Sequence, residues 1–147
     1  MPNRIVDILL VDDSRSDVEL SLHYLKKCRL DKCVHVVRDG AEALEFLFCN
    51  GAYAGRHLDN VPKMILLDLR LPKVDGMEVL QQIKADPRTR KIPIVVLASS
   101  PLDYRIDECR QLGVDNYIVK PVDVEQFMTV TANLNMYWRQ PDRPSGT

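Results

Sequence analysis

The sequence has no run of basic residues, no paired cysteines and no long apolar stretch. Lysine and arginine number 20 against 21 acidic residues, so we expect no nucleic-acid surface. The four cysteines are scattered without a Cys-x-x-Cys pair, and the three histidines do not cluster with them, which argues against zinc and is typical of reduced thiols. No segment has the length of a membrane span or a signal peptide. We therefore expect a cytoplasmic protein without a membrane contact.

Five short aliphatic runs alternate with amphipathic stretches along the 147 residues. Unbroken aliphatic runs such as MILL are typical of strands that are covered on both faces, as in a parallel sheet. The pattern predicts a single α/β domain, a three-layer sandwich with right-handed crossovers. The expected strands are Ile8–Val11, Val34–Val37, Met64–Leu67, Ile94–Leu97 and Tyr117–Val119.

Helix boundaries are marked by capping residues. A side chain that can cap a helix stands three residues before an acidic one in three places, Ser14 and Asp17, Asp39 and Glu42, and Asp75 and Glu78. Gly113 is suited to end the fourth helix just after Leu112. The last helix is expected to carry its core stripe on Val124, Phe127, Met128, Thr131, Leu134 and Trp138.

Two segments depart from this alternation. Residues 49–63 form a loop longer than most connections in compact domains, and surface decoration is its simplest interpretation. Residues 139–147 are a polar segment that contains proline. We expect one domain over residues 1–138, followed by this tail.

Charged residues follow three of the expected strands. Asp12 and Asp13 follow the first strand, Asp68 follows the third and Lys120 follows the fifth. In open α/β sheets, ligands bind outside the carboxyl ends of the strands, so these side chains are expected in one crevice. A single aspartate after a strand is usually a turn or cap residue, but three strand ends with charged groups favour a common site.

Three converging carboxylates would repel one another unless they are protonated or bridged by a cation. Oxygen ligands alone favour a hard ion such as Mg²⁺. A compact ammonium group such as that of Lys120 suits a phosphate nearby. A carboxylate beside Mg²⁺ and a lysine is well placed to attack phosphorus, so Asp68 is predicted to be a nucleophile.

Three motifs together resemble the receiver domains of two-component response regulators. They are ILLVDDS with the acidic pair, MILLDLRLPKVDG with the acceptor aspartate, and YIVKPV with the lysine. The resemblance covers roughly residues 5–138 and implies the flavodoxin-like receiver fold, with strand order 2-1-3-4-5. It also implies that a histidine kinase donates a phosphoryl group to Asp68 and that Lys120 pairs with that group.

The same resemblance implies a ligand set for Mg²⁺ and a cis peptide bond before Pro121. The ligands would be Asp12, Asp13, Asp68 and the backbone carbonyl of Arg70.

One position departs from the receiver pattern. Receivers carry threonine or serine at the end of the fourth strand, where this chain has Ala98. Because a shift of one residue along a strand turns a side chain to the other face, Ser99 replaces that hydroxyl only if the loop bends. Phosphorylation is expected to survive, whereas the conformational switch is in doubt. Tyr117 is therefore either a switch residue or a packed strand-end aromatic.

Three features resemble the response regulators encoded beside phytochrome kinases. They are the long loop before the third strand, the sequence IPIVVLASS and the segment NMYWRQPDRP. This subgroup implies a bacteriophytochrome as the kinase and a homodimer through the face of the fourth helix, fifth strand and fifth helix. Val130 and Tyr137 could form a seam of that dimer, and Trp138 with residues 139–147 an arm or a core anchor.

The expected function is a stand-alone response regulator that signals through protein contacts and hydrolyses its own phosphoryl group slowly, without being a dedicated enzyme. An aspartate-nucleophile phosphohydrolase is disfavoured because those enzymes separate their two acids by one residue, whereas Asp12 and Asp13 are adjacent. A receiver-fold interaction module or a phosphate sink with an impaired switch is the alternative that Ala98 supports.

Overall fold

The computed structural model describes residues 7–27, 33–56, 60–114, 116–123, 125–130 and 132. Its sheet is entirely parallel, with the order β2-β1-β3-β4-β5, which confirms the predicted topology. The strands are β1 (Ile8–Val11), β2 (Val34–Val37), β3 (Met64–Asp68), β4 (Ile94–Ala98) and β5 (Asn116–Val119). Three of them are one residue longer than predicted, so Asp68 and Ala98 are the last residues of their strands.

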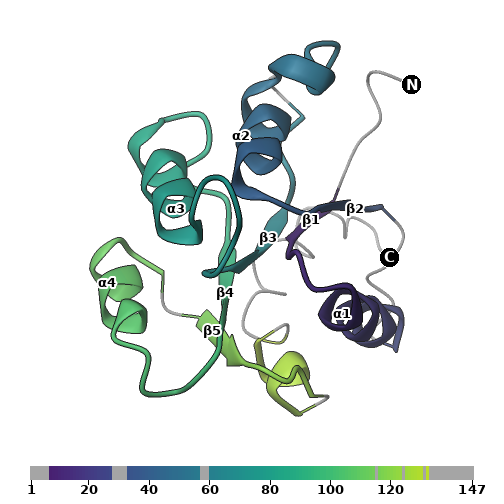
Figure 1. Cartoon of the computed structure of the whole chain (residues 1–147), viewed down its shortest axis with the longest axis vertical. Helices are drawn as coiled ribbons and strands as arrows, with labels where there is room; N and C mark the ends of the chain where they lie inside the picture. The colour runs from purple at the N-terminus through teal and green to yellow at the C-terminus, as the bar shows by residue number, and fades with distance from the viewer. Residues whose placement is uncertain are drawn as a thin grey trace, which may run out of the picture.

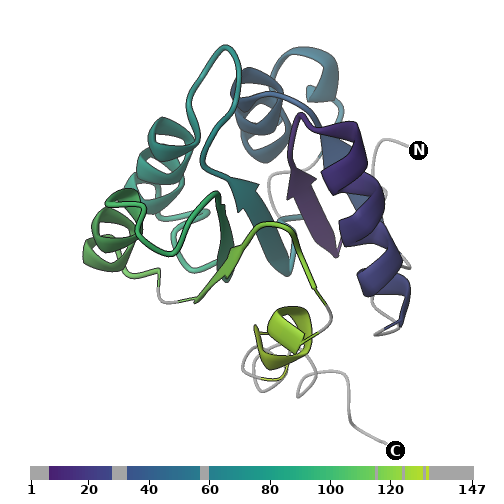
Figure 2. The same cartoon turned by 60° about the horizontal axis from the view of Figure 1, so that its bottom comes forward.

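Helices cover both faces of the sheet. They are α1 (Arg15–Lys27), α2 (Gly40–Phe48), the short 3₁₀ helix η1 (Gly51–Tyr53), α3 (Gly76–Ala85) and α4 (Arg105–Gln111), and residues 125–130 and 132 are also helical. Figures 1 and 2 show α2, α3 and α4 on one side of the sheet, with α1 and the yellow-green helix of residues 125–130 on the other. No helix of the described residues is long and apolar enough to cross a bilayer.

Successive residues of each central strand enter opposite halves of the core. Leu9 and Val11 pack with α2, α3 and α4, whereas Ile8 and Leu10 pack with α1 and residues 125–130. All four side chains are 0% exposed. Burial of each such side chain contributes about 1.5 to 3 kcal/mol, so the unbroken aliphatic runs are what a sheet covered on both faces requires.

The predicted caps are present at the starts of the first three helices. The amide of Asp17 donates to Ser14 Oγ at 3.3 Å, and the amide of Glu42 donates to Asp39 Oδ1 at 2.7 Å. Asp75 accepts from the amide of Met77 at 3.2 Å. At the other end of a helix, Gly113 follows α4 with a φ of +92°, a conformation that glycine adopts without strain.

Two expectations for the last helix are wrong. Met128, which was expected in the core stripe, is 56% exposed, and Val130, which was expected on a separate dimer seam, is 7% exposed and packs in the core. The helix is therefore rotated relative to the predicted stripe. Tyr137, Trp138 and the tail of residues 139–147 lie outside the described residues.

The described part of the loop between α2 and β3 is attached to the domain. The Tyr53 hydroxyl donates to Glu42 Oε2 at 2.7 Å and lies 2.9 Å from His35 Nε2. Arg56 lies over the Phe46 ring, 3.7 Å from its centroid, and donates to the backbone carbonyl of Phe46. This part of the loop is thus packed on β2 and α2.

Candidate functional site

The charged residues at the carboxyl ends of β1, β3 and β5 meet at one edge of the sheet. β1 and β3 are neighbours, and Val11 is in register with Leu67, which brings Asp12 beside Asp68. The amide of Lys120 donates to the carbonyl of Ala98 at 2.8 Å, which places the lysine next to the end of β4. The Lys120–Pro121 peptide bond is cis, as the family resemblance implied.

Lys120 bonds to three carboxylates. Its Nζ lies 2.7 Å from Asp68 Oδ2, 2.8 Å from Asp17 Oδ2 and 3.2 Å from Asp12 Oδ2. The Lys120 side chain is 17% exposed, so these ion pairs are shielded from water and stronger than surface pairs. The ammonium group therefore stands beside the predicted nucleophile, where an incoming phosphoryl group would need a positive charge.

Asp12, Asp13 and Asp68 form an acidic cluster. One carboxylate oxygen from each lies within 4.8 Å of the others. Asp12 is 0% exposed, and its Oδ2 has the Lys120 ammonium 3.2 Å away as an ion-pair partner but no further hydrogen bond among the described residues. One ammonium group shared among several carboxylates leaves this cluster negative, and a bound cation would compensate that charge. The donor set consists of hard oxygens and fits a divalent ion such as Mg²⁺. The carbonyl of Arg70 as a further ligand stays a prediction.

The pKa values of Asp12 and Lys120 are both raised, which favours the neutral form of the aspartate and the charged form of the lysine. Burial, together with the negative charge of Asp68, raises the pKa of Asp12 from 3.8 to about 6, although the amide of Ser14 lowers it. Burial lowers the pKa of Lys120, but hydrogen bonds to Asp17 and Asp68 more than offset this, so its pKa lies above the usual value. The lysine is charged at neutral pH, and the Asp12 proton competes with any cation below about pH 6.

Replacement of Asp12 by asparagine should stabilise the metal-free protein. The raised pKa of Asp12 means that the folded state binds this proton more tightly than the unfolded state, so stability is lost as pH rises from about 4 to about 6. At pH 7.5, Asp12→Asn should raise the free energy of unfolding by about 2 kcal/mol. Urea titrations in EDTA at pH 5 and pH 7.5 test this. A variant no more stable than wild type at pH 7.5 contradicts it.

Asp17 is a site residue that the sequence motifs did not single out. It was recognised only as the acidic partner of the Ser14 cap, yet its carboxylate bonds to Lys120 across 103 positions of the sequence. The available signal was its place in the first turn of α1, which begins at Arg15, two residues after the acidic pair. Three carboxylates thus bond to one ammonium group, and Asp13 adds a fourth negative charge to the cluster, which leaves the site negative and suited to a cation.

The position at which the receiver pattern carries a hydroxyl is apolar and buried here. Ala98 is 1% exposed, whereas Ser99 is exposed and lines a pocket with Ser100 and Arg105. This difference in exposure agrees with the expectation that Ser99 points away from the place of Ala98. Tyr117 is half-buried against the core, and the Arg110 guanidinium lies 5.6 Å from its ring centroid. Tyr117 is therefore packed at the end of its strand, as the second of the two interpretations above expected.

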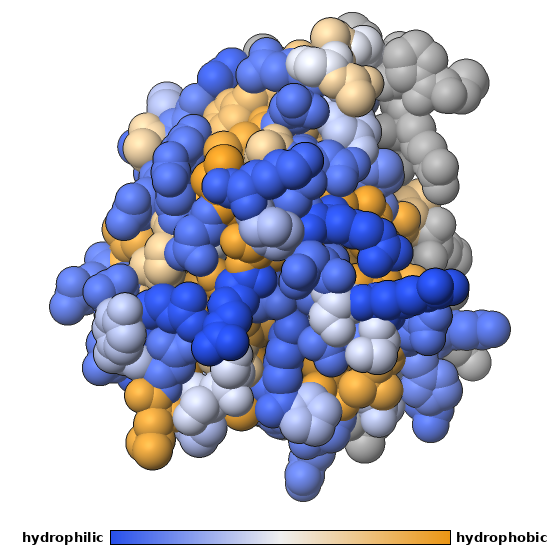
Figure 3. Space-filling view, viewed as in Figure 1, coloured by the Kyte–Doolittle hydropathy of each residue, from blue (hydrophilic) through white to orange (hydrophobic). Residues whose placement is uncertain are grey.

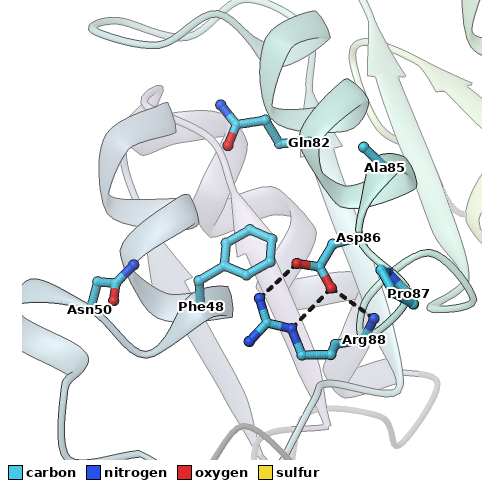
Figure 4. Close-up of a pocket in the computed structure, with 7 residues that line it drawn as sticks. All are labelled: Phe48, Asn50, Gln82, Ala85, Asp86, Pro87 and Arg88. Carbon is cyan, nitrogen blue, oxygen red and sulfur yellow. Dashed lines mark hydrogen bonds and ion pairs between the residues drawn. The ribbon is translucent and has the colours of Figure 1, made fainter.

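A different hollow, of about 520 Å³, lies where α2 and α3 end. Figure 4 shows Phe48 on one wall and the ion pair of Asp86 and Arg88 on the other. The hydrogen bonds from Arg88 lower the pKa of Asp86 to about 2. These two charges neutralise each other, whereas the carboxylates around Lys120 outnumber its single positive charge.

Comparison with known proteins assigns the family. Residues 8–132 match the model of the response regulator receiver domain. The chain belongs to this family. This receiver is 36% identical to the response regulator Rcp1 of Synechocystis sp. over 131 residues, which span 89% of this chain and 87% of Rcp1.

Solved structures relate this receiver to phytochrome response regulators. The bacteriophytochrome response regulator RtBRR has a TM-score of 0.83 and 44% identity, over 92% of this chain and 81% of RtBRR. The phosphorylated cyanobacterial phytochrome response regulator RcpA has a TM-score of 0.75 and 36% identity, over 97% of this chain and 100% of RcpA. The Mn²⁺-bound form of Rcp1 has a TM-score of 0.74 and 35% identity, over 90% of this chain and 94% of that structure. The receiver is thus a response regulator related to those of phytochromes.

Proposed function

We propose that this receiver accepts a phosphoryl group on Asp68. The observation that carries the proposal is the position of Lys120 Nζ, 2.7 Å from Asp68 Oδ2, beside the acidic cluster of Asp12, Asp13 and Asp68. In the transfer, an Asp68 carboxylate oxygen forms a bond to phosphorus as the bond from phosphorus to the donor breaks. The donor, histidine or acetate, leaves with the electron pair of that bond.

Asp12, Asp13 and Asp68 are proposed to hold Mg²⁺, with the Arg70 carbonyl as an additional ligand. When bound, the ion neutralises negative charge on the phosphoryl oxygens. The backbone of the protein itself orients both carboxylates. The amide of Arg70 donates to Asp68 Oδ1 at 2.9 Å, and the amide of Ser14 donates to Asp12 Oδ1 at 3.0 Å. These backbone bonds hold both carboxylates in place before any ligand arrives.

The proposed donor is a sensor histidine kinase of the phytochrome type. The relatives RtBRR and RcpA are named as phytochrome response regulators, which supports this donor class. We further propose a cytoplasmic protein that signals through protein contacts, as a homodimer on the face of α4, β5 and the last helix. It would lose its phosphoryl group slowly without being a dedicated enzyme.

The alternative is an interaction module or phosphate sink, which the buried Ala98 favours. In either case no hydroxyl at position 98 is available to pull the loop after β4 toward a phosphoryl group. An unchanged oligomeric state after phosphorylation would support the phosphate sink, and a shift in oligomeric state would support the switching regulator.

Phosphorylation should depend on Mg²⁺. Incubation of the wild-type protein with acetyl phosphate and Mg²⁺ should give a phosphoryl adduct in the intact mass, and replacement of Mg²⁺ by EDTA should slow its formation at least about tenfold. Adduct formation at equal rates with and without Mg²⁺ would contradict the metal assignment. No adduct in Mg²⁺ would contradict the phosphoacceptor function itself.

A further inference from the structure

Large apolar side chains gather on the loop that follows β4. Leu102 is 90% exposed and Tyr104 is 71% exposed, and the other large exposed hydrophobic side chain among the described residues is Met128, at 56%. On the face shown in Figure 3, hydrophilic side chains predominate and the apolar ones are scattered between them. Two such residues on one short loop therefore depart from the rest of the surface.

This loop has a defined conformation. The amide of Leu102 donates to Ser100 Oγ at 3.1 Å, and the amide of Asp103 donates to the Ser100 carbonyl at 3.1 Å. Arg105 binds the Asp103 carboxylate at 2.7 Å. A surface that is ordered before contact loses less entropy on binding, which suits Leu102 and Tyr104 to recognition.

The loop borders the acceptor. Arg105 Nη1 donates to the carbonyl of Leu69, the residue after Asp68, at 3.5 Å. A shallow pocket of about 440 Å³ is lined by Leu102 and Tyr104 from this loop, by Arg105 at the start of α4 and by Arg70 from the loop after β3. The amide of Arg70 donates to Asp68 Oδ1 at 2.9 Å. The apolar side chains and the acceptor thus belong to adjoining loops of one edge.

A protein donor has to cover this edge. Asp68 is 5% exposed. The phosphohistidine of a donor protein therefore reaches it only if the donor surface around that histidine contacts the loops around Asp68. Reacting atoms need to come within about 3 to 3.5 Å. Acetyl phosphate is small enough to reach Asp68 without this contact. The two kinds of donor therefore differ in whether they meet Leu102 and Tyr104.

We infer that Leu102 and Tyr104 form a docking surface for the protein that donates the phosphoryl group. The partner surface has apolar side chains beside its phosphohistidine and an acidic side chain that faces the exposed Arg70. Aromatic and apolar anchors of this kind commonly dominate the energy of protein interfaces. This inference rests on the proposed phosphoacceptor function and adds the contact that selects the donor.

The test compares two donors on the same variants. The protein donor is a phytochrome-type histidine kinase, autophosphorylated with radiolabelled ATP, that phosphorylates the wild-type chain, and the small donor is acetyl phosphate with Mg²⁺. Leu102→Ala with Tyr104→Ala should lower kcat/KM for transfer from the kinase about 30-fold, with the acetyl phosphate rate unchanged within about twofold. Met128→Ala is the matched control, an exposed apolar side chain on another element, and should behave as wild type.

Three outcomes would overturn the inference. One is transfer from the kinase at the wild-type rate in the double variant. Another is an equal loss with both donors, which would mean that the substitutions act on the chemistry at Asp68. A third is a change in oligomeric state with normal transfer, which would assign the surface to contact between copies. Failure of wild type with acetyl phosphate would instead overturn the proposed function.

Discussion

Asp68→Asn should gain no phosphoryl group from acetyl phosphate in Mg²⁺, under conditions that modify the wild-type protein fully. The amide of asparagine is not a nucleophile for phosphorus, and it removes one of the three carboxylates of the acidic cluster. The variant should fold, because Lys120 keeps its bonds to Asp17 and Asp12 when Asp68 loses its charge. Intact mass after incubation measures the adduct, and circular dichroism checks the fold.

The matched control is Asp107→Asn. This aspartate lies on α4 with a side chain that is 77% exposed, in an ion pair with Arg110. Exposed pairs contribute little to stability, so the control should be modified like wild type. A phosphoryl adduct of normal yield on Asp68→Asn would show that another residue is the acceptor.

Gly76→Ala should destabilise the protein by about 4 kcal/mol and slow phosphorylation of the folded fraction. A Cβ at this position would lie 2.4 Å from the Asp68 carbonyl oxygen and 2.6 Å from the Leu69 Cα. Both are backbone atoms, so no change of side-chain rotamer relieves the overlap. Either the start of α3 or the end of β3 has to move. A movement of the end of β3 would displace Asp68, the acceptor.

Gly113→Ala provides the comparison for Gly76→Ala. Gly113 has a φ of +92°, but an added Cβ there would meet no heavy atom within 4 Å. Its cost is therefore conformational, about 1 kcal/mol. Urea denaturation of both variants separates the two effects. Equal stability losses at the two positions would mean that the close approach at Gly76 is relieved by small shifts.

The strands and helix starts could be predicted because their signals are local. A run such as ILLV from Ile8 to Val11 is buried on both faces of one parallel sheet, and a cap such as Asp39 bonds within its own helix turn. The acidic cluster was predictable for a related reason. Parallel strands carry their carboxyl ends to one edge, so Asp12 and Asp68 meet wherever their strands are neighbours.

Contacts that depend on tertiary placement could not be predicted. The bond of Asp17 to Lys120 depends on how α1 is positioned over the sheet, which periodicity does not define. The burial of Val130 and the exposure of Met128 depend on the rotation of the last helix, since both residues suit an apolar stripe. The attachment of Tyr53 to Glu42 likewise arises from the fold of a loop without a regular pattern.

The parallel sheet also determines when this site exists during folding. Asp68 and Lys120 are 52 positions apart, and Asp12 and Lys120 are 108 apart, so no segment of a few dozen residues contains the site. Each strand is joined to the next strand along the chain by a crossover, and the loop-closure entropy of each crossover is lost before its contacts form. Helices can form early from local contacts, but cation binding waits for the central strands to assemble. Affinity for a divalent ion is therefore a measure of complete folding, which helix content is not.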